Sequence, residues 1–273
     1  MKYAIISTAA LIAVFGLSFL IFGLVRKKLK NKPPMAVHIL ISTGTAILVL
    51  GISGFIYLNI HYPAQEEAVA VFAGSNNPKV TKIDGGYMID GSGNDTALIF
   101  YPGAKVDSEA YLPLMKKIAD GGIDCFLLSP PMRLAILDPN GADRIIENYN
   151  YKTWILSGHS MGGLTASGYA SGHEKVDGVV LLAAYPNSPL PGSTALLSVY
   201  GTEDKVLERP VYEENKKYFP NGYKEKVIDG GNHAQFGSYG EQSGDGEAKI
   251  SRDEQQAQTA RAVLEFAGGI KLK

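Results

Sequence analysis

The amino-acid sequence predicts an α/β fold with a doubly wound, mostly parallel sheet, preceded by a hairpin of two transmembrane helices. Apolar strand-like runs alternate with helical stretches from residue 68 onward, and two long apolar segments occupy the first 60 residues. A serine between glycines, in Gly158-His159-Ser160-Met161-Gly162, lies where an apolar run meets a small-residue helical stretch. The first two observations predict the architecture, and the third indicates where its chemistry lies.

Composition restricts the function classes. With 273 residues, 45% of them hydrophobic, the chain can form one medium domain and accessory segments. Its 26 basic and 27 acidic residues are balanced, and no basic stripe with interleaved aromatics follows the apolar segments, so we expect no nucleic-acid partner. The five histidines lack metal-ligand spacing, which argues against a metal site. Cys125 lies in an apolar run, which predicts a buried thiol.

The first 60 residues predict two membrane-spanning helices. Residues 3–25 are uncharged and almost entirely apolar, long enough at helical rise to cross a bilayer core of about 30 Å. A basic loop and two prolines follow, then a second apolar run at residues 36–60. A secretory signal peptide is the competing interpretation of the first run, but the strong charge comes after it and a second span follows.

The basic loop predicts the orientation of this hairpin. The positive-inside rule keeps the loop in the cytoplasm, because it carries Arg26, Lys27, Lys28, Lys30 and Lys32. The chain after Ile60 then lies outside the cytoplasm, in a multi-pass protein of the cell membrane. Within the second span we expect His38, Ser42, Thr43 and Thr45 either to form hydrogen bonds between the helices or to lie near the membrane interface. The predicted domains are the hairpin at 1–60 and a globular domain at 61–273.

The globular domain reads as alternating strands and helices. Short opening strands are predicted at residues 69–72, 80–83 and 87–89, where glycines punctuate the sequence. Further strands are predicted at residues 97–101, 125–128, 154–156, 178–183, 195–200 and 223–228, and the continuous apolar run at 97–101 is typical of a strand buried on both faces of a parallel sheet.

Helices are predicted between these strands. Asp107 is expected to cap a helix that ends at Gly121-Gly122, and Ser251 with Glu254 forms a capping box for the last helix. Three further helices are predicted near residues 142–148, 163–170 and 209–218, and the last helix near residues 253–266. About a dozen residues separate strands 178–183 and 195–200, too few for a helical cap over the site.

The glycine-flanked serine fits an exposed nucleophile. Glycines two residues before and after Ser160 allow a tight strand-to-helix turn that lifts the hydroxyl out of the sheet. A serine hydroxyl needs a base to accept its proton and an acid to orient that base. Later strand exits supply Asp204 and His233, which gives the order Ser160, Asp204, His233. Glu203 and Asp229 are the alternative acids.

Backbone amides are the expected oxyanion donors. The amide of Met161 lies at a helix N-terminus, where an unpaired N–H favours a developing negative charge. The second donor should come from the turn after strand 97–101, with Ala104 as the first choice and Lys105 as its rival. His159 has no predicted role beyond shaping the pocket.

These stretches together resemble the α/β-hydrolase superfamily, and more narrowly the bacterial α/β-hydrolase fold family 5. The resemblance runs from residue 97 to the last helix and is strongest at 100–107, 158–163, 200–204 and 230–237. It implies a hydrolase with Ser160 as nucleophile, Asp204 as acid and His233 as base, and with no cofactor. In this sequence Pro102 stands where lipases and esterases with an HGGG motif have histidine.

The sequence therefore predicts a membrane-anchored serine hydrolase, a carboxylesterase or lipase-like enzyme for small-molecule or lipid-like esters. Its partners would be that substrate and the bilayer, reached through the two N-terminal helices. One alternative is a peptidase or acyltransferase on the same triad. The other is a catalytically silent domain used for binding.

Overall fold

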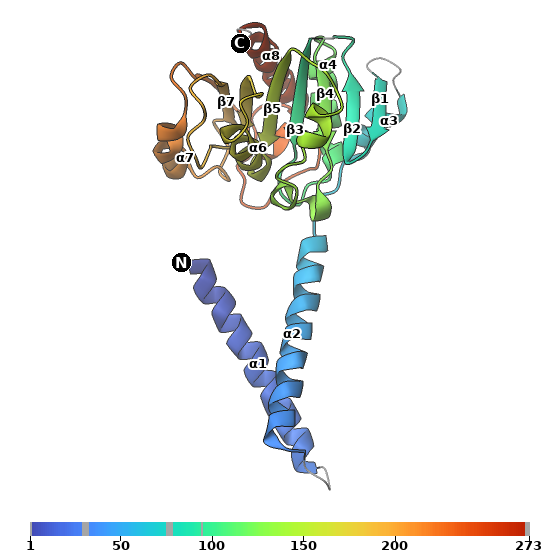
Figure 1. Ribbon diagram of the computed structural model, residues 1–273, viewed down its shortest axis with the longest axis vertical. Helices are drawn as coiled ribbons and strands as arrows, with labels where there is room; N and C mark the ends of the chain where they lie inside the picture. Colours follow the sequence, from blue (N-terminus) through green and yellow to red (C-terminus); the bar gives the residue numbers. More distant parts are fainter. Residues whose placement is uncertain (1, 29–32, 75–78, 94, 271–273) are drawn as a thin grey trace. The chain divides into compact units, whose positions relative to one another are not determined.

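The computed structural model describes residues 2–28, 33–74, 79–93 and 95–270 (Figure 1). It divides into two compact units, Met1–Ile60 and His61–Lys273. The first unit contains helices α1 (Lys2–Lys28) and α2 (Met35–Asn59). The second contains the sheet and its covering helices.

Helix α2 contains the one stretch in the described residues that is long and apolar enough to cross a membrane, Met35–Ile56. Helix α1 covers the other predicted span, but the side chains at its N-terminal end lie outside the described residues. The second membrane crossing therefore stays a prediction. Within this unit, buried His38 donates from Nε2 to the carbonyl of Phe19 at 3.0 Å, and the two rings stack at 4.2 Å. The expected hydrogen bond between the helices is confirmed at His38.

In the described residues, the second unit is built on an eight-stranded sheet of order β1-β2-β4-β3-β5-β6-β7-β8. The pairs β1–β2 and β2–β4 are antiparallel and all later neighbours are parallel, which confirms the predicted mostly parallel sheet. The strands are β1 (Lys79–Ile83), β2 (Gly86–Asp90), β3 (Thr96–Tyr101), β4 (Asp124–Leu128), β5 (Thr153–His159), β6 (Gly178–Leu182), β7 (Ala195–Gly201) and β8 (Lys224–Ile228).

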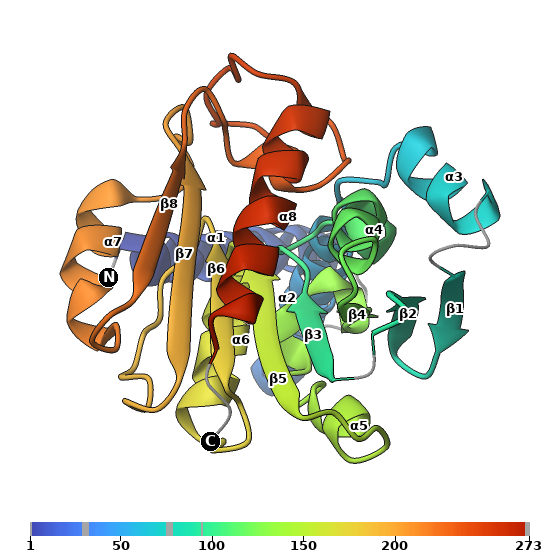
Figure 2. The ribbon, with the colours of Figure 1, turned by 90° about the horizontal axis from the view of Figure 1, so that it is seen from above.

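Helices cover both faces of this sheet (Figure 2). Along β3, Leu98 and Phe100 pack toward α4 (Leu112–Ala119) and α8 (Arg252–Gly268). The alternate residues Ala97, Ile99 and Tyr101 join the core under α5 (Asp143–Ile146) and α6 (Met161–Ser171). Because successive side chains of a strand point to opposite faces, the continuous apolar runs fill two cores at once. Helix α7 (Arg209–Asn215) lies between β7 and β8 in the chain.

Two local predictions are wrong. Residues 69–72, expected as a strand, belong to helix α3 (Glu66–Gly74). Ala68 is fully buried and Val71 packs against the α4-side core, so these residues present a helical i, i+3 face. Asp107 does not cap the following helix, which opens with a 3₁₀ turn at Ser108–Tyr111. Its carboxylate instead accepts the amide of Ala64 at 3.2 Å and pairs with Arg133.

Other predicted features are confirmed. The Ser251 hydroxyl accepts the amide of Glu254 at 3.2 Å at the start of α8. Cys125 is buried, and burial raises the pKa of its thiol. Residues 183–194, between β6 and β7, contain neither helix nor strand, so no helical cap is inserted there.

Candidate active site

Ser160 lies between β5 and α6 in a strained backbone conformation. Its φ of 53° and ψ of −122° place it in a region that residues with a side chain rarely adopt. A Cβ at Gly158 would overlap the backbone of Gly162, and one at Gly162 would overlap the carbonyl of Tyr101. The glycines are therefore needed because the turn, the helix start and the end of β3 approach one another closely.

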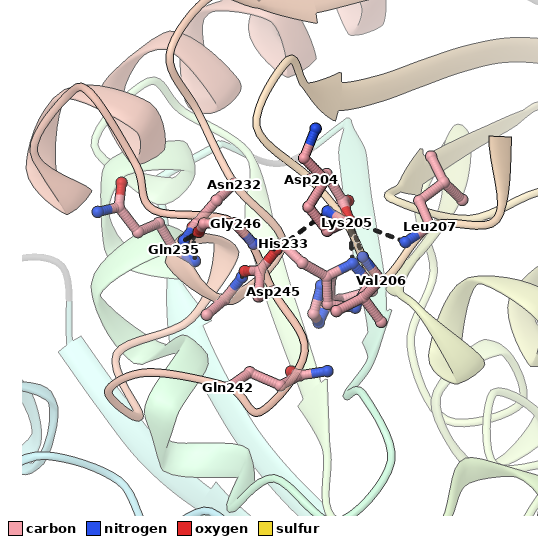
Figure 3. Close-up of polar contacts among 12 residues, drawn as sticks. Asp204, Lys205, Val206, Leu207, Asn232, His233, Gln235, Gln242, Asp245 and Gly246 are labelled. Atoms are coloured by element: carbon pink, nitrogen blue, oxygen red, sulfur yellow. Dashed lines mark hydrogen bonds and ion pairs between the residues drawn. The ribbon is translucent and has the colours of Figure 1, made fainter.

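His233 and Asp204 form a buried hydrogen-bonded pair (Figure 3). His233 Nδ1 lies 2.9 Å from Asp204 Oδ2, and the side chains are 2% and 0% exposed. The other carboxylate oxygen accepts the amides of Val206 at 2.9 Å and Leu207 at 2.8 Å. This arrangement fixes the carboxylate, holds the Nδ1 proton of the imidazole and leaves Nε2 to act as a base.

The geometry separates the possible acids. Glu203 pairs with Lys249 at 2.6 Å, and this ammonium lowers the pKa of the Glu203 carboxyl. Asp229 accepts a hydrogen bond from the Thr202 hydroxyl at 3.4 Å. Asp204 is the acid that contacts the imidazole of His233.

Asp245 joins the two loops that carry His233 and Asp204 (Figure 3). One of its oxygens accepts the amide of Ala234, next to His233, at 2.9 Å. The other accepts the amide of Lys205, next to Asp204, at 3.2 Å. One carboxylate thus sets the spacing of both loops. The sequence analysis missed this residue, because no motif relates position 245 to loops about 10 and 40 residues earlier.

The structure distinguishes the two turn amides proposed as oxyanion donors. The amide of Lys105 donates to the carbonyl of Arg133 at 2.8 Å, so it is already engaged. In the part of the chain that the structure describes, no protein acceptor is found for the amides of Ala104 and Met161. Met161 is the first residue of α6, where amides lack a partner within the helix. Ala104 is therefore the donor available in the turn.

Residues 62–64 brace this turn. The amide of Tyr62 donates to the carbonyl of Lys105 at 2.7 Å, and the carbonyl of Tyr62 accepts the amide of Asp107 at 3.0 Å. Arg133, whose carbonyl accepts the Lys105 amide, pairs with the Asp107 side chain. Lys105 and Arg133 both have a positive φ, 61° and 57°. The surrounding hydrogen bonds hold this unfavourable backbone in place.

His159 lies behind the site rather than in solvent. Its Nδ1 is 2.8 Å from the hydroxyl of Tyr111, which accepts the amide of Gly103 at 3.1 Å. Its ring centroid lies 4.4 Å from that of His233. Burial first, and then the neighbouring His233, lower the pKa of His159, so its imidazole stays neutral. His159 therefore links the elbow to the turn as an uncharged spacer.

A small cavity of about 230 Å³ opens at Ser160 and His233. Its other lining residues come from α6 and from the exits of β6 and β7: Met161, Leu164, Ala183, Ala184, Tyr185, Val206, Leu207 and Glu208. In the described residues, no group of three or more His, Cys, Asp or Glu side chains could hold a metal ion. The cavity thus brings an elbow serine and an acid-oriented imidazole together in one space.

Comparison with known families decides the relationship. A model of the alpha/beta hydrolase family matches residues 97–257, which include the elbow and the loops that carry Asp204 and His233. The chain belongs to the alpha/beta hydrolase family. A comparison with curated proteins found no match.

Several solved structures share the fold. DcsB, determined with a substrate analogue, has a TM-score of 0.54 and 15% identity, covering 71% of this chain and 99% of that one. MGS-MChE2, an alpha/beta hydrolase from a lagoon-sediment metagenome in Morocco, has a TM-score of 0.51 and 14% identity, covering 69% and 97%. Epoxide hydrolase A from Mycobacterium thermoresistibile has a TM-score of 0.50 and 11% identity, covering 71% and 99%. At these identities the likeness concerns the fold.

The clamp formed by Asp245 leads to a prediction. Asp245→Ala should lower kcat for an activated ester about 10- to 100-fold, because the His233 and Asp204 loops lose their common acceptor and small misplacements are costly. The measurement is steady-state hydrolysis together with the melting temperature. Asp253→Ala is the matched control, since Asp253 pairs with Lys117 on the surface and should leave kcat unchanged. An Asp245→Ala protein with wild-type kcat would contradict a positioning role.

Proposed function

We propose that this chain is a membrane-anchored serine hydrolase that cleaves carboxylic esters with Ser160, His233 and Asp204. The observation that carries the proposal is the buried His233–Asp204 hydrogen bond beside the strained elbow serine, with Ser160 and His233 lining one cavity. A silent binding domain has no need for such an oriented imidazole. A strained serine backbone at a site is also typical of function.

The proposed reaction has two stages. His233 Nε2 accepts the Ser160 proton while Oγ bonds to the ester carbonyl carbon, and the oxyanion meets the amides of Met161 and Ala104. The carbon–oxygen bond to the alcohol then breaks as His233 returns the proton to the leaving oxygen. Water hydrolyses the acyl-enzyme by the same sequence, with His233 again the base. The Asp204 carboxylate orients His233 and stabilises the imidazolium formed in each stage.

The membrane part of the proposal rests on sequence and on α2. We place both apolar runs, 3–25 and 36–60, across the membrane, with the basic loop at 26–32 in the cytoplasm. Residues 61–273 then lie on the extracytoplasmic side, close to the bilayer because they follow the second span directly. This location favours small-molecule or lipid-like esters as substrates.

Substitution of each proposed catalytic residue provides the first test. Ser160→Ala, His233→Ala and Asp204→Asn should each lower kcat on an activated ester by about 10³-fold or more without unfolding the domain. A fluorophosphonate should label the wild type and leave Ser160→Ala unlabelled. Glu203→Gln is the matched control and should retain activity. Loss of activity in Glu203→Gln with retention in Asp204→Asn would reverse the assignment of the acid.

The oxyanion site provides a second test. Ala104→Pro removes one amide donor without adding charge, and loss of such a donor typically lowers kcat by about 10²-fold. KM should change little, because the interaction forms in the transition state. The melting temperature must be compared, since proline can also distort the turn. A stable Ala104→Pro protein with undiminished kcat would place the donor elsewhere.

The topology has its own test. Alkaline phosphatase fused after Lys273 should be active, because we place the C-terminal domain outside the cytoplasm. The same reporter fused in the basic loop after Lys32 should be inactive, whereas a cytoplasmic fluorescent reporter should give the reverse pattern. Activity from the loop fusion alone would invert the orientation.

A further inference from the structure

One face of helix α6 extends away from Ser160. Met161, Leu164, Thr165 and Gly168 are spaced i, i+3, i+4 and i+7, so they lie in a row along that face. Met161 and Leu164 line the cavity at Ser160, and Leu164, Thr165 and Gly168 line a second cavity of about 310 Å³. Leu164 belongs to both linings, so both cavities border this one side chain.

The second cavity is suited to a hydrocarbon chain. Tyr169 and His173 form part of it with rings stacked 3.7 Å apart at an interplanar angle of 4°. The Tyr169 hydroxyl donates to Asp143 and the Thr165 hydroxyl to the carbonyl of Met161, so these polar atoms are already engaged. Ile136, also in the lining, is 56% exposed and adds apolar surface. The rest of the lining is Pro139 and two exposed asparagines, Asn140 and Asn187, which carry no charge.

The charges along this path disfavour anionic ligands. No lysine or arginine is among the described residues that line either cavity. Glu208 is the carboxylate at the Ser160 cavity, and its charge opposes an anionic group. A carboxylate or phosphate beside Ser160 would therefore be disfavoured, and no lysine or arginine lines the second cavity to bind one there. An uncharged chain fits both the charge and the apolar surface.

We propose that this path along α6, the α6 groove, binds the acyl chain of the ester, and that Gly168 allows the chain to extend beyond Leu164. From Met161 to Gly168 the helix rises about 10 Å. This length matches a medium-chain acyl group rather than a short one. The acyl arm is the one retained on Ser160 after the alcohol leaves, directly beside the first turn of α6. The proposal rests on the proposed function, because it assigns the substrate of that same site.

Gly168 offers a selective test. A Cβ added there meets no atom within 4 Å, so a side chain would project into the open groove without a backbone clash. Leucine also has a higher helix propensity than glycine, so Gly168→Leu should not destabilise α6. In the full chain, Gly168→Leu should lower kcat/KM for p-nitrophenyl decanoate at least tenfold, roughly the effect of one or more lost methylene contacts. The kcat/KM for p-nitrophenyl butyrate should change less than twofold.

Gly192→Leu is the matched control, because that position is equally open and lines neither cavity. Gly192→Leu should leave kcat/KM unchanged for both the decanoate and the butyrate ester. Equal effects of Gly168→Leu on butyrate and decanoate, or no effect on either, would overturn the assignment of the groove. A length dependence that follows the alcohol of alkyl esters instead of the acyl chain would overturn it too. Failure of the wild type to hydrolyse butyrate or react with fluorophosphonate would instead contradict the proposed function.

Discussion

The left-handed backbone at Ser160 is the constraint on which the rest of the site depends. A residue with a side chain in this conformation costs about 1–3 kcal/mol, so the surrounding structure must hold it there. The fully buried strand β5 and the packed helix α6 provide that support. The close approach of Gly162 to the carbonyls of Tyr101 and Pro102 also brings the end of β3, and the turn after it, against the start of α6. The backbone strain at Ser160 and the closeness of the two amides proposed as oxyanion donors thus arise from the same close packing.

The remaining parts of the site are held by contacts between distant segments. Asp245 joins the loops of His233 and Asp204, and Gln255 on α8 exchanges two hydrogen bonds with the backbone of Asn232, at 3.0 and 2.8 Å. Because a side-chain amide here replaces a strand partner, the loop is fixed without belonging to the sheet. Such buried polar contacts specify one geometry, since any other would leave donors unpaired.

The turn that follows β3 is held in the same way. Its backbone is paired with residue 62 on one side and with Arg133 on the other, and a neutral His159–Tyr111 pair supports it from the interior. An uncharged imidazole suits this place, because a positive charge here would repel the imidazolium that the proposed mechanism forms at His233. The segment that follows the candidate membrane span therefore contributes directly to the turn beside Ser160.

The sequence by itself determined the α/β architecture and the position of the elbow. Apolar runs that alternate with helical stretches are typical of strands buried in a parallel sheet, and the glycines around Ser160 meet a requirement of the local backbone. The sequence did not determine residues 69–72, whose apolar pattern suits a strand or a short helix equally. Packing of Ala68 and Val71 against the core stabilises the helix rather than a strand.

Tertiary structure also decided what neighbouring residues of similar type do. Asp204 rather than Glu203 reaches His233, and Lys105 rather than Ala104 gives its amide to Arg133, because remote segments supply those partners. Asp107 looks like a helix cap in sequence but binds Ala64 and Arg133 in the fold. The local sequence thus determines which loops carry the polar residues of the site. Hydrogen bonds to residues far away in the chain determine which atoms of those loops face the site.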